Sequence, residues 1–281
     1  MFGGARSVLS LTTFLLTISL LPSPSRPATG SFIYGGCSQL KYNPGTPYES
    51  NLNSLLTSLV NSATFSSYNN FTILGSTPQD VVYGLYQCRG DLPMPDCATC
   101  VAHSVSQLGV LCFDSSGGAL QLQGCFVKYD NTTFLGVEDK TVLMKKCGPS
   151  IGYNTDAMSR RDAVFSGLAS AGGAYRVGGS GGVQGVTQCV GDLSSSECQD
   201  CVSEAIGRLR TDCATAVSGD MFLGKCYARY SAGGQYSKAK SDSSEEDAGK
   251  TLAIIIGILA GVALIIIFLS IIRKGFQEKG K

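Results

Sequence analysis

The feature that most constrains the fold is a set of cysteine spacings that occurs twice in the 281-residue chain. Residues 88–100 read CRGDLPMPDCATC and residues 189–201 read CVGDLSSSECQDC, and both copies continue to two further cysteines after eleven and then twelve residues. A constant offset of 101 relates the copies, and it also pairs Gln87 with Gln188 and Tyr129 with Tyr230. A period of about 100 residues is the size of one small domain, which predicts two tandem homologous domains.

The N-terminus indicates the compartment in which these cysteines mature. Arg6 precedes an apolar run over residues 8–21, and the helix-breaking sequence PSPSRPATG follows. This pattern predicts a secretory signal peptide over residues 1–29, with cleavage within residues 26–31. Cys37 and Cys147 each lie upstream of one block, which brings each domain to six cysteines. In an oxidising compartment an even count predicts disulfides, and six cysteines allow fifteen pairings among which the spacing does not choose.

The C-terminal region contains a second apolar segment, LAIIIGILAGVALIIIFLSII, which carries no charge. Its length of roughly 31 Å as a helix matches a hydrocarbon core of about 30 Å, which predicts a transmembrane helix over residues 251–272. Residues 233–250 are polar and predict a flexible stalk. Residues 273–281 carry four basic residues and one acid, which places this short tail in the cytoplasm. The chain is therefore predicted to be a type I membrane protein, and its net charge of +1 gives no reason to expect a nucleic-acid partner.

Both domains show the same order of predicted elements. Leu52, Leu55 and Leu59 follow the spacing of an amphipathic helix, and residues 164–171 repeat it more weakly. Residues 81–88 and 182–189 predict strands, residues 96–112 and 197–213 predict second helices with Asp96 as an N-cap, and residues 119–130 and 221–231 predict closing strands. The expected fold class is α+β: two tandem disulfide-stapled domains, each an antiparallel β-sheet with two α-helices on one face, followed by a single transmembrane helix.

The spacing C-x8-C-x2-C, with one upstream and two downstream cysteines, resembles the ginkbilobin-homologous, or stress-antifungal, domain of land plants. Two such domains, over residues 30–136 and 142–232, with one membrane span and a short tail, resemble the plasmodesmata-located protein family rather than the cysteine-rich receptor-like kinases. The resemblance implies six disulfides, which are Cys37–Cys112, Cys88–Cys97, Cys100–Cys125, Cys147–Cys213, Cys189–Cys198 and Cys201–Cys226.

Catalytic and metal chemistry find little support in the sequence. The pairs Cys97/Cys100 and Cys198/Cys201 have the spacing of zinc or redox sites, but in a secreted chain structural disulfides are favoured. His103 is the only histidine, and its position relative to Val101 on the predicted helix indicates a solvated surface residue. No local motif nominates a pair of catalytic carboxylates. We therefore expect no enzyme activity, no metal and no cofactor.

The resemblance also nominates positions for sugar binding. In the ginkbilobin-type domain, mannose is bound by an Asn just after the first cysteine, an Arg six residues before the last cysteine and a Glu five residues after it. The corresponding residues here are Ser38, Ala119 and Asp130 in the first domain, and Gly148, Asp220 and Ser231 in the second. Neither alanine nor a carboxylate can donate the hydrogen bonds of a guanidinium, so we expect neither domain to bind mannose.

Other motifs are more modest. Asn70 and Asn131 begin glycosylation sequons on the luminal side. Ala253, Gly257 and Gly261 place small residues on one face of the membrane helix, which allows lateral association of helices. The RGD triplet of residues 89–91 is expected to be incidental, because the second copy reads VGD.

The architecture predicts a membrane-tethered interaction protein without enzymatic activity. The family that it resembles is located at plasmodesmata, modulates cell-to-cell trafficking, acts through callose deposition and is engaged by viral movement proteins. The expected partners are the membrane, other membrane proteins including a second copy of the chain, viral movement proteins and a cell-wall ligand. The alternative is a cell-surface coreceptor or lectin-like ligand-binding protein in plant defence. A secreted antifungal lectin is disfavoured by the membrane span.

Overall fold

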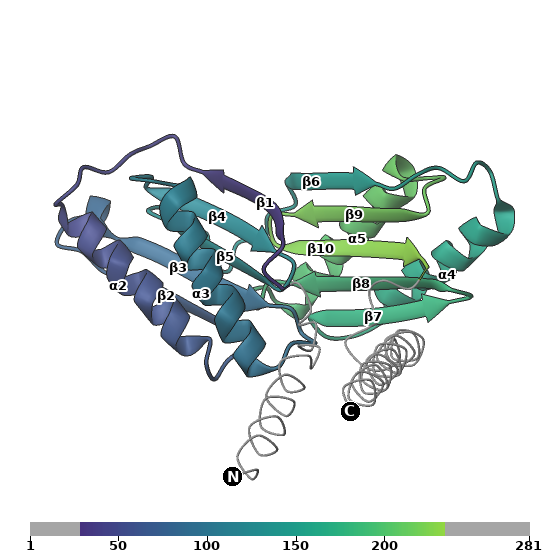
Figure 1. The fold of residues 1–281 in the computed structure, drawn as a ribbon, viewed down its shortest axis with the longest axis horizontal. Coiled ribbons are helices and arrows are strands. Elements are labelled where there is room, and N and C mark those ends of the chain that lie inside the picture. Colours follow the sequence, from purple (N-terminus) through teal and green to yellow (C-terminus); the bar gives the residue numbers. More distant parts are fainter. Residues whose placement is uncertain (1–28, 234–281) are drawn as a thin grey trace, which may run out of the picture.

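The computed structural model describes residues 29–233, which form two five-stranded antiparallel sheets, each with two helices on one face (Figure 1). The first sheet and its helices comprise β1 (Phe32–Cys37), α2 (Pro47–Ser62), β2 (Tyr68–Ile73), the 3-10 helix η1 (Pro78–Asp80), β3 (Val82–Cys88), α3 (Met94–Leu111), β4 (Gly117–Leu122) and β5 (Cys125–Asp130). The second comprises β6 (Val142–Cys147), α4 (Thr155–Ser170), β7 (Tyr175–Ser180), β8 (Val183–Cys189), α5 (Ser195–Asp212), β9 (Ser218–Leu223) and β10 (Cys226–Ala232). The predicted α+β class with tandem antiparallel sheets is confirmed.

The rest of the predicted architecture falls on residues outside this range. The signal peptide, the stalk, the transmembrane helix and the cytoplasmic tail lie almost entirely within residues 1–28 and 234–281, which the structure does not describe. Within residues 29–233, no helix combines the length and hydropathy needed to cross a bilayer.

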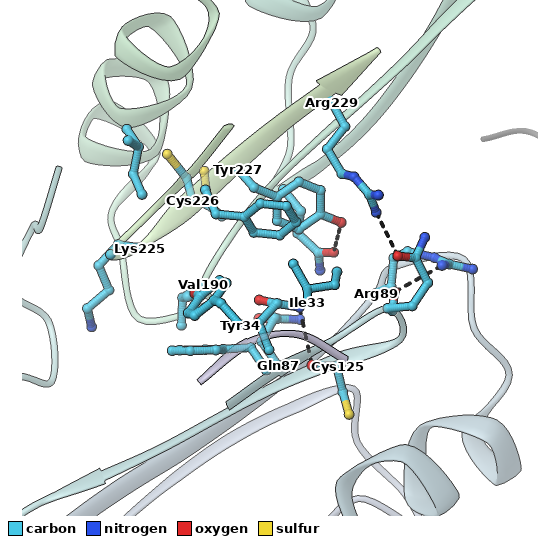
Figure 2. Close-up of a pocket in the computed structure, with 18 of the residues that line it drawn as sticks. Ile33, Tyr34, Gln87, Arg89, Cys125, Val190, Lys225, Cys226, Tyr227 and Arg229 are labelled. Carbon is cyan, nitrogen blue, oxygen red and sulfur yellow. Dashed lines mark hydrogen bonds between the residues drawn. The ribbon is translucent and has the colours of Figure 1, made fainter. Parts of the chain in front are cut away.

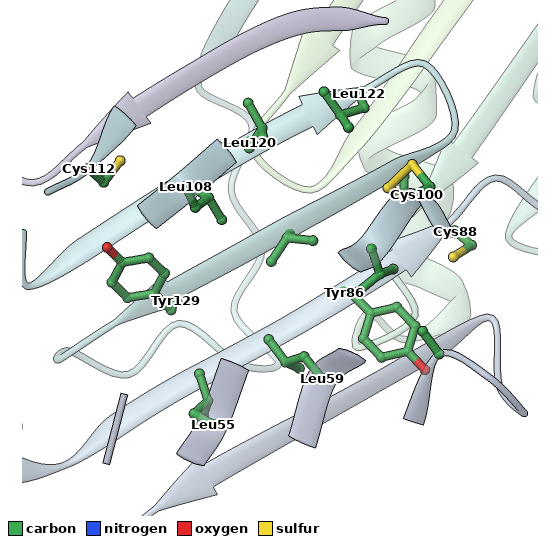
Figure 3. Packing of buried hydrophobic residues seen from close by; sticks show 14 of the residues in the cluster. Leu55, Leu59, Tyr86, Cys88, Cys100, Leu108, Cys112, Leu120, Leu122 and Tyr129 are labelled. Atoms are coloured by element: carbon green, nitrogen blue, oxygen red, sulfur yellow. A yellow bond between two sulfur atoms is a disulfide. The ribbon is translucent and has the colours of Figure 1, made fainter. Parts of the chain in front are cut away.

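The two sheets have the same strand order, β1-β4-β5-β3-β2 and β6-β9-β10-β8-β7. The central strands pair in equivalent register, so that Cys88 lies opposite Cys125 and Cys189 lies opposite Cys226. Alternate residues of these strands face the helices and form a core with the apolar stripes of those helices. Figure 3 shows this core in the first domain. Helix α2 approaches closely because Gly84 has no side chain: a Cβ atom there would lie 2.3 Å from Leu55.

All twelve cysteines of the chain are paired in the structure. The six disulfides are Cys37–Cys112, Cys88–Cys97, Cys100–Cys125, Cys147–Cys213, Cys189–Cys198 and Cys201–Cys226, the same set that the resemblance implied. In each domain one bridge connects β3 or β8 to the start of the following helix, a second connects that helix to the last strand, and a third connects the end of the helix to the first strand. The bridges therefore link the second helix to three strands of its own sheet.

Two details of the sequence prediction were wrong. Helix α3 begins at Met94, with Pro93 at the N-cap position, and Asp96 lies in the first turn instead of capping it. The stretch 119–130, predicted as one closing strand, is a hairpin that turns at Gln123 and Gly124, and residues 221–231 form its counterpart. A turn of two residues inside an otherwise strand-like sequence does not interrupt the apolar pattern enough to be recognised.

Candidate functional site

The helix-free faces of the two sheets meet, and reciprocal glutamines hold the contact together. Gln87 accepts a hydrogen bond from the Gly191 backbone N–H at 2.9 Å, and Gln188 donates through Nε2 to the Cys88 carbonyl at 2.9 Å. These glutamines are equivalent under the repeat offset, so the domain contact has an approximate two-fold symmetry. Gln87 of the first domain contacts Gly191, two residues after Cys189 of the second, and Gln188 of the second domain contacts Cys88 of the first.

The glycines of the duplicated cysteine motif make the contact close. A Cβ atom on Gly90 would lie 2.5 Å from the Tyr175 ring, and one on Gly191 would lie 2.7 Å from the Tyr68 ring. Each tyrosine begins an edge strand of the opposite domain, at equivalent positions of β2 and β7. Arg89 binds Asp91 within the motif at 2.6 Å, so the RGD triplet is engaged in an internal ion pair.

A buried ion pair makes the symmetry incomplete. The Lys225 ammonium pairs with the Asp192 carboxylate, and the two side chains are only 2% and 4% exposed. Lys225 also donates to the Phe134 carbonyl at 3.0 Å, and Asp192 accepts from the Gly136 N–H at 2.9 Å. Burial lowers the pKa of Lys225, and the Asp192 charge opposes this shift. The ion pair therefore binds the segment that connects the two sheets, through Phe134 and Gly136, to the second domain.

The interface encloses a cavity of about 30 Å³ (Figure 2). Tyr227 donates to the Gln188 side chain at 3.0 Å, and Arg229 donates to the Gln123 side chain at 3.0 Å. Burial raises the pKa of the Tyr227 hydroxyl above its usual range. The volume has room for about one or two water molecules, so this cavity is too small for a sugar or a peptide side chain. The polar groups around it orient the two sheets relative to each other.

A larger hollow of about 410 Å³ lies beside this contact, lined mainly by the first domain and also by Leu143 and Gly224 of the second. It is lined by Ser38, Ala119 and Asp130, so the structure brings together the three first-domain positions that correspond to the mannose site. Gly117 forms part of the floor, and a Cβ atom there would lie 2.7 Å from the Asp130 carboxylate. The volume falls in the range of small-molecule sites.

Two charged residues of this hollow, Lys128 and Asp139, were not predicted from the sequence. Lys128 lies opposite Ala119 in the β4–β5 pair, and its ammonium is 4.4 Å from the centre of the Phe134 ring. Asp139, from the connection between the sheets, also lines the hollow. Strand register could have identified Lys128, because the residue opposite Ala119 follows from the two-residue hairpin turn. The charged groups of the hollow are therefore the ammonium of Lys128 and the carboxylates of Asp130 and Asp139. The arginine of the ginkbilobin-type site is replaced by Ala119.

The corresponding positions of the second domain do not form the same hollow. The residue equivalent to Ala119 is Asp220, which binds Arg229 at 2.8 Å. A Cβ atom on Gly148 would lie 2.3 Å from the Ser218 hydroxyl, and Ser231 is buried. The first domain thus offers the candidate ligand site, and the second domain fills the equivalent position with an ion pair.

The other predicted residues lie at separate places. Asn70 is exposed on the edge strand β2, where its Nδ2 donates to the Tyr68 hydroxyl at 2.7 Å. Asn131 is half-buried and follows Asp130 at the rim of the hollow. His103 is exposed on α3 and contacts Gln107 at 3.0 Å, as predicted for a surface residue. Ala253, Gly257 and Gly261 fall outside the described residues. Residues 29–233 contain no group of three or more potential metal ligands.

Comparisons with known proteins agree with this architecture. The family described as "Salt stress response/antifungal" matches residues 36–132 and 146–233. Plasmodesmata-located protein 7 of Arabidopsis thaliana is 64% identical over 264 residues, covering 92% of this chain and 89% of that protein. Plasmodesmata-located protein 6 of the same plant is 60% identical over 278 residues, covering 95% and 96%.

Solved structures give the same result for the fold. The crystal structure of the tandem DUF26 ectodomain from the Arabidopsis thaliana cysteine-rich receptor-like protein PDLP5 superposes with a TM-score of 0.69 at 50% identity, covering 72% of this chain and 100% of that one. The corresponding ectodomain of PDLP8 superposes with a TM-score of 0.71 at 45% identity, covering 73% and 100%.

Proposed function

Because the chain belongs to the plasmodesmata-located protein family, we propose that it is a plasmodesmal type I membrane protein that modulates cell-to-cell trafficking by binding and recruiting other proteins. The observation that carries this proposal is the similarity of nearly the whole chain to relatives whose names state a plasmodesmal location. The proposed organisation is a signal peptide over residues 1–29, domains over 30–136 and 142–232, a stalk over 233–250, a membrane helix over 251–272 and a cytoplasmic tail over 273–281.

The described geometry supports a role in presentation and recruitment without catalysis. Reciprocal hydrogen bonds and the buried Lys225–Asp192 pair hold the two domains together, so a partner would meet one continuous surface. Callose deposition is proposed as a consequence of recruitment, and viral movement proteins are proposed as partners that engage the chain. Asn70 and Asn131 are proposed to carry glycans, and Ala253, Gly257 and Gly261 are proposed to form the helix-packing face in the membrane.

A second candidate function is a ligand-binding coreceptor in plant defence. The hollow of about 410 Å³ beside Lys128 and Asp130 favours it, because that volume accommodates a small cell-wall ligand. In that case a second membrane protein is proposed to carry the signal into the cell.

The deciding experiment combines location and transport. A fluorescent fusion of the full chain should form puncta across the cell wall, and changing its abundance should change the spread of a freely diffusing fluorescent protein between neighbouring cells. An even distribution over the plasma membrane, together with unchanged spread on overexpression and on loss, contradicts the plasmodesmal proposal and favours the coreceptor.

A further inference from the structure

Four large apolar side chains are exposed at one corner of the first domain. They lie in the last turn of α3, just after it, and on the segment after β1, and their exposed fractions are Leu40 65%, Val110 82%, Leu111 49% and Phe113 70%. We call these four residues the first-domain corner. The backbone holds its parts together, because the Ser116 N–H donates to the Leu40 carbonyl at 2.9 Å. Exposed apolar side chains gathered in this way typically mark an interaction surface.

The second domain shows that the fold does not require apolar side chains at three of these four positions. Under the repeat offset of 101, the residues equivalent to Val110, Leu111 and Phe113 are Thr211, Asp212 and Ala214. Helix α5 nevertheless ends at the same place as α3, and an equivalent disulfide ties it to the first strand. The apolar side chains of the first-domain corner therefore have a role other than maintaining the backbone.

Two charged residues at the edge of the corner indicate the kind of partner. Lys41 donates to the Ser115 hydroxyl at 2.9 Å and to the Phe113 carbonyl. Asp114 directly follows Phe113. Within residues 29–233, Lys41 has no carboxylate and Asp114 has no cationic group within 4.0 Å.

The second domain again differs at these positions. Its equivalents of Lys41 and Asp114 are Ser150 and Thr215, whose hydroxyls bond to each other at 2.7 Å. An apolar surface with one cation and one anion at its edge is complementary to itself across a two-fold axis, because the cation of each copy can face the anion of the other.

We propose that the first-domain corner is the surface on which a second copy of the chain packs, with Lys41 of each copy facing Asp114 of the other. The corner lies where α3 ends and β4 begins, at the end of the first sheet away from the second domain (Figure 1), so the contact leaves the domain interface intact. Four such side chains expose on the order of 500 Å² per copy, which is at the lower end for a specific interface. The contact would be weak in solution and strengthened when a membrane helix confines both copies.

Self-association of the full chain in detergent micelles, followed by sedimentation and by energy transfer between labelled copies, tests this proposal. The corner variant Val110→Thr/Leu111→Asp/Phe113→Ala places the second domain's own residues at these positions. We expect it to raise the dimer dissociation constant at least about tenfold. The matched control Phe65→Ala/Leu74→Thr removes apolar side chains that are equally exposed elsewhere on the first domain, and we expect no change.

Charge-reversal variants test the same contact even if the corner variant folds poorly. Lys41→Glu and Asp114→Lys should each weaken self-association, because each places like charges opposite each other in a symmetric pair. A mixture of the two variants should associate as well as the unmodified chain, because opposite charges then face each other in both places. A monomeric unmodified chain, an unaffected corner variant or a mixture no better than the single variants would each overturn the proposal. The test is independent of where the protein is located in the cell.

Discussion

The two domains share one disulfide frame, and both first helices bury apolar side chains, which in α4 are Val164, Phe165 and Leu168, but the second domain adds a buried arginine beside its first helix. In the first domain, α2 buries an apolar stripe that includes Leu55 and Leu59. In the second, buried Arg176 of β7 donates to the Leu168 carbonyl of α4 at 3.1 Å and to the Gly173 carbonyl at 2.9 Å. Burial lowers the pKa of Arg176. The two domains keep the same disulfides and strand order although the residues that pack against their first helices differ.

The largest expected effect comes from removing an equivalent cross-link in each domain. The bridges Cys37–Cys112 and Cys147–Cys213 close loops with sequence separations of 75 and 66. Replacing both cysteines of either bridge with serine should destabilise its own domain by about 4 kcal/mol. Peptide-resolved hydrogen exchange on the full chain measures each domain separately. A much smaller loss in one domain would show that the shared frame does not stabilise both equally.

The next largest effect is expected from the buried arginine that distinguishes the second core from the first. Arg176→Met should destabilise the second domain by about 3 kcal/mol, because it leaves two backbone carbonyls and the Gln199 side chain without their donor. The control Arg208→Met makes the same chemical change at an exposed i,i+4 pair with Glu204 and should cost less than about 0.5 kcal/mol. Denaturant unfolding compares the two variants. Equal losses would mean that buried Arg176 adds no more stability to the second domain than an exposed ion pair does.

A smaller effect is expected at the domain interface, where two equivalent glycines should contribute equally to the free energy of the contact. Gly90→Ala and Gly191→Ala should each weaken the domain contact by about 1 to 2 kcal/mol, because the added Cβ meets a tyrosine ring. Gly109→Ala and Gly207→Ala are matched controls on α3 and α5, where an added Cβ meets nothing within 4 Å. These controls should stabilise their helices slightly.

Faster exchange of the amides after Cys88 and Cys189 in the two interface variants, with the helices unchanged, is the expected result. If only one of the two variants loosens the contact, the two halves of the interface are not equivalent.

The sequence predicted those elements whose pattern is local. Cysteine spacing identified the duplicated domains, and the apolar period of residues 52–59 identified the first helix. The strands β1, β2, β6 and β7 were not predicted, and β7 has little apolar alternation because it contains Gly178 and Gly179 and its one buried residue is Arg176. A strand with one covered face alternates clearly only when its covered positions are apolar, and in β7 the buried position is Arg176.

The site was harder to predict than the fold. The interface residues Gln87 and Gln188 were paired by the repeat, but nothing in a local motif places two polar side chains 101 positions apart in contact. Lys128 was missed in the hollow because its relation to Ala119 depends on the register of a hairpin that was predicted as one strand. Long-range pairing and short-range turn geometry therefore account for most of what the sequence did not reveal.

The smallest expected effect concerns the two interface tyrosines. Burial, assisted by the Asp91 charge, raises the pKa of Tyr175 to about 12. Burial also raises the pKa of Tyr68, but the hydrogen bond from Asn70 opposes that shift. A tyrosine whose pKa is higher in the folded state stays protonated there while the unfolded chain ionises. The contribution of Tyr175 to stability is thus fully present below pH 10 and is lost as the pH rises from about 10 to about 12.

Rapid pH jumps monitored by tyrosinate absorbance can separate the two rings. Compared with the unmodified chain, Tyr175→Phe should remove a late-ionising group and Tyr68→Phe an earlier one. Asn70→Ala should move the Tyr68 ionisation to higher pH and leave Tyr175 unchanged, because only Tyr68 has that hydrogen bond. Coincident ionisation of the two tyrosines, or a shift of Tyr175 in the Asn70 variant, would contradict the asymmetry. Separate ionisation would show that equivalent contacts on Gly90 and Gly191 are made by tyrosines in electrostatically different surroundings.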